Sequence, residues 1–164
     1  MDLYHRTSIY TAYKIINSQQ IWSNDGYEQA NFHTEKFGGG SDCEDEITLH
    51  FKWSGGSPIE LPNKWVGNIP SHVPVPKKWP GLPNTLYKAY MSGKSKLWAL
   101  VLFPGTVQNL AIVDCSDVTI KSERELKYKE YIFKEILNSL SNSPIPVSVP
   151  EPKNRRNIHL PKLP

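Results

Sequence analysis

The sequence predicts a single domain of the α+β class, and three patterns along the chain predict it. Residues 46–53 alternate between polar and apolar side chains, which is typical of a strand with one buried face. Residues 9–17 carry apolar side chains three and four positions apart, which is typical of an amphipathic helix. Residues 97–103 form an uninterrupted apolar run, which suits a strand that is buried on both faces.

The N-terminal segment predicts a strand that leads directly into a helix. Residues 3–7 alternate in polarity, and Ser8 then stands where a helix N-cap belongs. The helix is expected to end near residue 17 or 18. Its apolar stripe consists of Ile9, Ala12, Tyr13 and Ile16.

The segments between these elements predict short strands and loops. Residues 21–23 resemble a second short strand, residues 24–26 a turn, and residues 35–46 a glycine-rich acidic loop. Seven prolines fall between Pro58 and Pro83, so we expect a long ordered loop without regular elements there. Residues 110–113 predict a further strand, expected beside the strand at 97–103.

The charged segment from Ser122 to Leu140 supports two interpretations. Pairs spaced i, i+4, such as Glu130 with Lys134, and an apolar side formed by Ile132, Ile136 and Leu140 favour one solvated helix. The alternative is a short helix that ends at Lys129, followed by a strand that begins at Glu130. Periodicity alone favours the single helix.

Composition and length limit the classes of function. The 164 residues suffice for one core, and we assign residues 1–142 to the domain and residues 143–164 to a proline-rich basic tail. The formal charge of +3 permits contact with nucleic acid without requiring it. We expect no membrane-spanning segment and no signal peptide, and therefore a cytoplasmic location in the producing or target cell. Cys43 and Cys115 lack the spacing of a zinc site, so we expect no metal and two thiols, with a disulfide as the alternative.

A resemblance to a known superfamily begins at the N-terminal strand. Tyr4-His5-Arg6-Thr7, followed at once by a capped helix, resembles the opening motif of the ADP-ribosyltransferases, which include PARP-like enzymes and DarT-like toxins. The resemblance implies a split, mostly antiparallel sheet with flanking helices. It also implies that His5 and Thr7 hold NAD at its adenine-side ribose, while backbone groups of the same strand, including Arg6, take the nicotinamide carboxamide.

A second segment resembles the one that carries the catalytic glutamate of that superfamily. Glu130 is followed by an aromatic residue and two apolar residues, Tyr131-Ile132-Phe133. The resemblance implies that its carboxylate stabilises the positive charge that grows as nicotinamide leaves, and helps to deprotonate the incoming nucleophile. The middle residue of the family's triad has no clean match in this chain. Phe32 is the first candidate for the ring that stacks on nicotinamide, with a core aromatic as the alternative, and Tyr27 is the next candidate.

Together the two segments imply an ADP-ribosyltransferase that cleaves the nicotinamide–ribose bond of NAD. The expected acceptor of ADP-ribose is a macromolecule, either nucleic acid or protein, and a toxin or effector role is expected by analogy. We expect a monomer with NAD as its only small-molecule partner. Two alternatives stay open, namely an NAD glycohydrolase with water as acceptor and a non-catalytic binding module on the same fold.

Overall fold

The computed structural model describes residues 1–21, 30–35, 47–60, 84–90, 98–102, 107–116, 126–141 and 144–149. Two helices and eight strands lie in this part of the chain, and the α+β class is confirmed. The elements are β1 (Asp2–Thr7), α1 (Ile9–Ser18), β2 (Ala30–Phe32), β3 (Ile47–Trp53), β4 (Ile59–Glu60), β5 (Tyr87–Tyr90), β6 (Trp98–Leu102), β7 (Leu110–Ser116), α2 (Leu126–Leu140) and β8 (Ile145–Pro146). No helix among these elements is both long and apolar enough to span a membrane.

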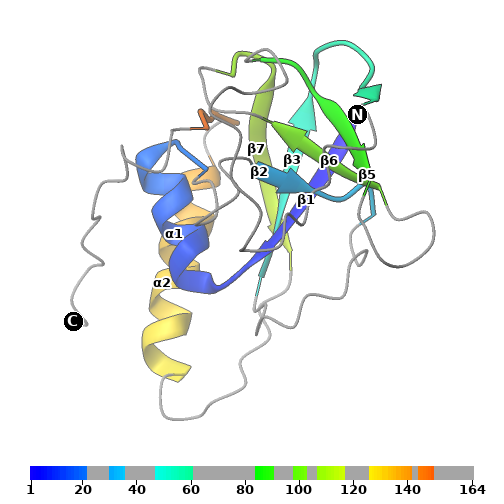
Figure 1. The fold of residues 1–164 in the computed structure, drawn as a ribbon. Helices are drawn as coiled ribbons and strands as arrows, with labels where there is room; N and C mark the ends of the chain where they lie inside the picture. Colours follow the sequence, from blue (N-terminus) through cyan, green and yellow to red (C-terminus); the bar gives the residue numbers. More distant parts are fainter. Residues whose placement is uncertain are drawn as a thin grey trace.

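The strands form two four-stranded sheets (Figure 1). Sheet A has the order β1-β3-β7-β8, and all of its pairs are antiparallel. Sheet B has the order β2-β6-β5-β4, and only its β4–β5 pair is parallel. The predicted mostly antiparallel character is therefore present in both sheets.

The predicted passage from strand to helix at the N-terminus is confirmed. Ser8 adopts an extended conformation, and its Oγ accepts a hydrogen bond from the backbone N–H of Thr11, which lacks a partner within the helix. Ile9, Ala12 and Ile16 are buried as their spacing predicts. The helix ends at Ser18, and the left-handed backbone of the C-cap residue Gln19 (φ 55°) stops the helical hydrogen-bond pattern.

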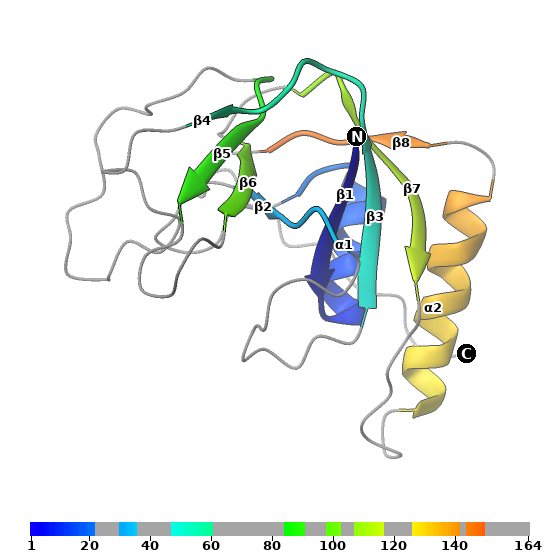
Figure 2. The same ribbon diagram turned by 90° about the vertical axis from the view of Figure 1, so that its right-hand side faces the viewer.

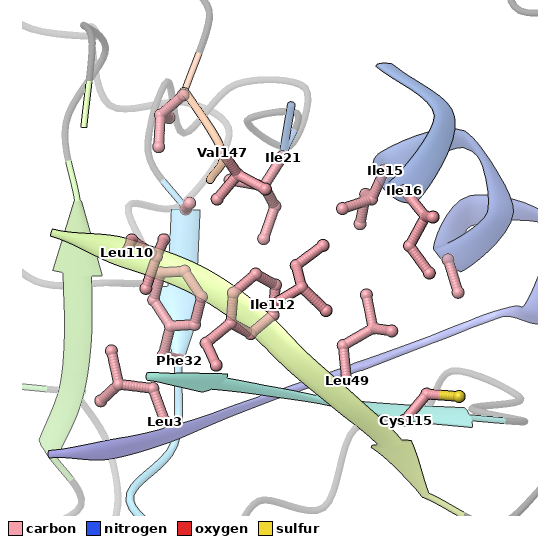
Figure 3. Close-up of a cluster of buried hydrophobic side chains, with 14 of the residues drawn as sticks. Leu3, Ile15, Ile16, Ile21, Phe32, Leu49, Leu110, Ile112, Cys115 and Val147 are labelled. Atoms are coloured by element: carbon pink, nitrogen blue, oxygen red, sulfur yellow. The ribbon is translucent and has the colours of Figure 1, made fainter. Parts of the chain in front are cut away.

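Strand β3 supplies much of the core of sheet A. Ile47, Leu49, Phe51 and Trp53 are all less than 4% exposed and share one face, as their alternation predicts. Figure 3 shows Leu49 beneath Ile15 and Ile16 of α1, on the same side of the sheet as Ile112 of β7. Leu3 of β1 belongs to the same buried cluster. We call this the inner face of sheet A, and the opposite one its outer face.

Helices α1 and α2 run side by side, and α2 also contacts β7 (Figure 1). Figure 2 shows α1 behind β1 and β3, so that it covers the inner face of the sheet. Ile132 and Ile136 of α2 are fully buried in the same core cluster as Ile15 of α1. The two helices thus close the core on the inner side of sheet A.

Two predictions about strands are wrong. Strand β7 is not the neighbour of β6, because β7 lies between β3 and β8 in sheet A while β6 pairs with β2 and β5 in sheet B. Sequence adjacency favours pairing, but the hydrogen-bonding edges of β6 are taken by other strands. Within the proline-rich stretch, Ile59 and Glu60 form β4, so a short regular element does occur there, at the edge of a sheet.

The predicted tail begins inside the folded domain. β8 pairs with β7, and Val147 and Val149 are buried in the core at 2% and 1% exposure. Backbone hydrogen bonds join Ser148 to Gln19 and Ile21 at the end of α1. The packed domain therefore extends at least to Val149, past the predicted boundary at residue 142.

Some predictions concern residues outside the described ranges. These are the turn at 24–26, most of the acidic loop at 35–46, the loop after Glu60 and the tail after Val149. The predicted strand at 21–23 is described only at its first residue, Ile21, which is not part of a strand. Residues 22 and 23 lie outside the described ranges.

Candidate functional site

The N-terminal strand joins the two sheets. The N–H of Tyr4 donates to the carbonyl of His33 at 2.9 Å, and the N–H of His33 donates back to Tyr4 at 2.8 Å. His33 directly follows β2, whose own residues pair with β6. β1 and β2 therefore meet at this one bridge, and we call this place the junction of the two sheets.

His5 lies at this junction. Its register partner is Leu49, so its ring is on the inner face of sheet A and is partly exposed. The ring centroid lies 6.0 Å from that of Phe32 on β2. His5 is thus the side chain by which β1 reaches across to the second sheet.

A backbone carbonyl sets the orientation of the His5 ring. Nδ1 of His5 lies 3.0 Å from the carbonyl oxygen of Asn31. Because a carbonyl oxygen only accepts, Nδ1 carries the proton in this hydrogen bond. In the neutral ring Nε2 is then an acceptor, suited to a ligand hydroxyl.

Arg6 and Thr7 follow on alternate sides of β1. The N–H of Trp53 donates to the carbonyl of Met1, so the odd-numbered residues of β1 direct their backbone groups toward β3. The backbone groups of Arg6 consequently point the same way as those of Tyr4, toward the junction. Thr7 is 9% exposed and lies opposite Ile47, so its side chain is on the inner face of sheet A at the last position of β1.

Phe32 is a core aromatic. Its side chain is fully buried, and its ring packs edge-on against Phe51 with 5.2 Å between centroids. A ring enclosed in this way presents no face to a ligand, so the stacking role expected for Phe32 is wrong and the core alternative applies. Tyr27, the next candidate, lies outside the described residues.

Glu130 lies within α2, which continues without interruption to Leu140. The single helix that periodicity favours is confirmed, and the strand beginning at Glu130 is wrong. The physical reason is the spacing of Ile132 and Ile136, since burial every fourth residue requires a helix whereas a strand buries every second residue.

The position of Glu130 on α2 directs it away from the core. Its side chain is exposed, and it lies two residues before the buried Ile132, about 200° around the helix axis. α2 contacts α1 and β7, while β1 lies two strands from β7 in sheet A. The structure therefore does not bring Glu130 together with His5.

Several features of the junction escaped prediction from the sequence. Asn31 contributes only a backbone carbonyl, which no side-chain pattern reveals. The pairing of Tyr4 with both His33 and His50 depends on strand register, which alternation alone does not specify.

Among the residues that the structure describes, no group of three or more His, Cys, Asp or Glu side chains could hold a metal ion. Cys115 is a free, buried cysteine. Burial, together with the nearby Asp114 carboxylate, raises the pKa of its thiol to about 11, so the thiol stays protonated near neutral pH.

Comparisons with protein-family models, with curated proteins and with solved structures find no match for this chain.

Proposed function

We propose that this chain is an NAD-dependent ADP-ribosyltransferase on an ADP-ribosyltransferase-like split sheet, with a nucleic acid or a protein as acceptor. The observation that carries the proposal is the junction of the two sheets. There the ring of His5 and the backbone of Arg6 come from successive residues of one strand and point to the same region.

The chemistry of this region suits the nucleoside parts of NAD. With Nδ1 of His5 donating to Asn31, Nε2 accepts a hydrogen bond from a ribose hydroxyl. The backbone of Arg6 faces the junction on the same side of β1 as the backbone of Tyr4, which is where the resemblance expects the nicotinamide carboxamide. Both groups sit on a strand braced by β3 and by the capped helix α1, so they are held in place before a ligand arrives.

The resemblance assigns the catalytic carboxylate to Glu130. Because Glu130 is exposed on α2, away from His5, NAD binding and catalysis can be tested separately. One observation favours the alternative of a non-catalytic NAD-binding module, namely that α2 holds Glu130 away from His5. The alternative of NAD hydrolysis differs from transfer only in the acceptor.

The test uses the full chain and NAD labelled in its adenine moiety, incubated with a mixture of protein, DNA and RNA. Wild type is compared with His5→Ala, Glu130→Gln and, as control, Ser139→Ala on the exposed side of α2. Nicotinamide release, label on each macromolecule and the Kd for NAD are measured for each variant.

We expect His5→Ala to weaken NAD binding roughly tenfold, the value of one lost hydrogen bond in a partly exposed site. Glu130→Gln should leave the Kd near that of wild type and lower nicotinamide release on the order of 100-fold. Ser139→Ala should behave as wild type.

The remaining outcomes separate the alternatives. NAD binding without nicotinamide release identifies the binding module, and release without labelled macromolecule identifies the glycohydrolase. Undiminished release by Glu130→Gln removes Glu130 from the mechanism. Absence of NAD binding by wild type overturns the proposal as a whole.

A further inference from the structure

Strand β2 places two successive residues beside the ring of His5. His33, which follows β2, pairs with Tyr4, so the backbone groups of Asn31, two residues earlier, also point toward β1. The carbonyl oxygen of Asn31 lies 3.0 Å from Nδ1 of His5. The ring of the next residue, Phe32, has its centroid 6.0 Å from that of the imidazole, with 58° between the two planes.

The two contacts restrict the imidazole in different ways. The χ2 torsion of a histidine is broad and roughly two-fold, so one hydrogen bond does not by itself fix the plane of the ring. The carbonyl of Asn31 selects Nδ1 as the nitrogen that carries the proton, because a carbonyl oxygen only accepts. The ring of Phe32 lies within the range of aromatic contact and limits the rotation that remains.

Phe32 can limit this rotation because the core holds its own ring in place. Its side chain is fully buried within the cluster that Figure 3 shows. Its ring meets that of Phe51 edge-on, with 5.2 Å between centroids and 78° between planes, and Phe51 is fully buried as well. Side chains in a close-packed interior keep to one rotamer. Phe51, Phe32 and His5 thus form a row that leads from the core to the partly exposed imidazole at the junction.

We propose that Phe32 is a positioning residue for His5. Its ring keeps the imidazole in the plane in which Nδ1 donates to Asn31, and it thereby keeps Nε2 as the acceptor of the neutral ring. Phe32 acts only through His5 and touches no ligand. The effect on NAD affinity rests on the proposed function, whereas the orientation of the His5 ring does not.

The tautomer of His5 distinguishes this role from a purely structural one. If Phe32 only fills the core, its loss lowers stability and leaves the proton of His5 on Nδ1. If Phe32 positions His5, its loss lets the ring rotate away from the Asn31 carbonyl, and the proton then occupies both nitrogens in turn.

The experiment records ¹⁵N NMR spectra of the full chain with labelled histidines, without NAD and at alkaline pH, where imidazoles are neutral. Protonated and unprotonated ring nitrogens differ widely in chemical shift, so the spectrum reports the tautomer. The signals of His5 are those missing from His5→Ala.

Wild type is compared with Phe32→Leu, which removes the ring, and with the matched control Ile136→Val. Ile136 is also fully buried, but it lies on α2. Far-UV circular dichroism checks that each variant is folded. If Phe32→Leu is unfolded, Phe32→Met takes its place, since it lacks the ring and its flexible side chain fills irregular gaps.

We expect Nδ1 of His5 to be the protonated nitrogen in wild type and in Ile136→Val. In Phe32→Leu the two ring signals should move toward each other, because two tautomers exchange. Wild-type signals in Phe32→Leu, an equal change in Ile136→Val or a proton on Nε2 in wild type would overturn the proposal.

A second measurement carries the effect to NAD. Phe32→Leu should raise the Kd for NAD roughly threefold, less than His5→Ala, while Ile136→Val keeps the Kd of wild type. Absence of NAD binding by wild type would overturn the proposed function and leave the tautomer result standing. An unchanged tautomer in Phe32→Leu would remove Phe32 from its role and leave NAD binding untouched.

Discussion

On strand β3, Phe51 and Lys52 are neighbours in the chain but lie on opposite faces of sheet A. Phe51 is fully buried among the residues that α1 covers, whereas the Lys52 side chain is 55% exposed and bonds to Asp2. The inner face is therefore held by apolar burial and the outer face by polar pairs. Because water competes with polar pairs but not with apolar contacts, the two faces contribute very unequally to stability.

The largest effect is expected on the inner face. Phe51→Ala removes a buried ring that packs against Phe32, and it should lower the free energy of unfolding by about 3–5 kcal/mol. Lys52→Ala, one residue further, should lower it by less than about 1 kcal/mol. Urea denaturation of both variants measures these free energies of unfolding. Similar losses in the two variants would show that burial does not distinguish the stability contributions of the two faces.

A smaller effect is expected where the strand turns into the helix that covers the inner face. Ser8→Ala removes the acceptor for the N–H of Thr11 and should lower the free energy of unfolding by about 1 kcal/mol. The matched control is Ser139→Ala on α2, whose exposed hydroxyl only donates to the carbonyl of Glu135. Thermal unfolding of the two variants should show a loss for Ser8→Ala alone, and equal losses would argue against the cap.

The smallest effect is expected on the outer face and depends on pH. The pKa of Asp2 is lowered in the folded chain by hydrogen bonds from Lys52 and His50, so the unfolded chain binds more protons as pH falls past the ordinary value of 3.8. The contribution of Asp2 is therefore present above that value and disappears as pH falls through the folded-state pKa.

Asp2→Asn makes this dependence measurable. Wild type should have the higher Tm near pH 6, and the difference from Asp2→Asn should shrink progressively as pH falls below 3.8. A difference that stays constant over this range would mean that the charge of Asp2 plays no part on the outer face.

The sequence predicted those elements that can be recognised from adjacent residues alone. The alternation of residues 47–53 indicates a strand because strands and helices differ in period. Ser8 indicates the start of a helix because an N-cap side chain bonds only to the first turn. The residues of β6 and β7 were also predictable, but their partners were not. Both are apolar strands, and nothing within 97–113 specifies that one joins sheet B and the other sheet A.

The candidate site was predictable only in part, for the same reason. His5 and its strand could be found because motif and helix cap lie within eight residues. The burial of Phe32 and the outward direction of Glu130 depend on what packs against β2 and α2.

The sequence by itself determined that Tyr4, His5 and Arg6 alternate along a strand that enters a capped helix. It also determined that residues 126–140 carry the period of a helix. Only the tertiary structure decided which partners those side chains meet, namely Asn31 for His5 and both His33 and His50 for Tyr4. The reason is that periodicity depends on neighbours in the chain, whereas register and sheet order depend on contacts between segments far apart in it.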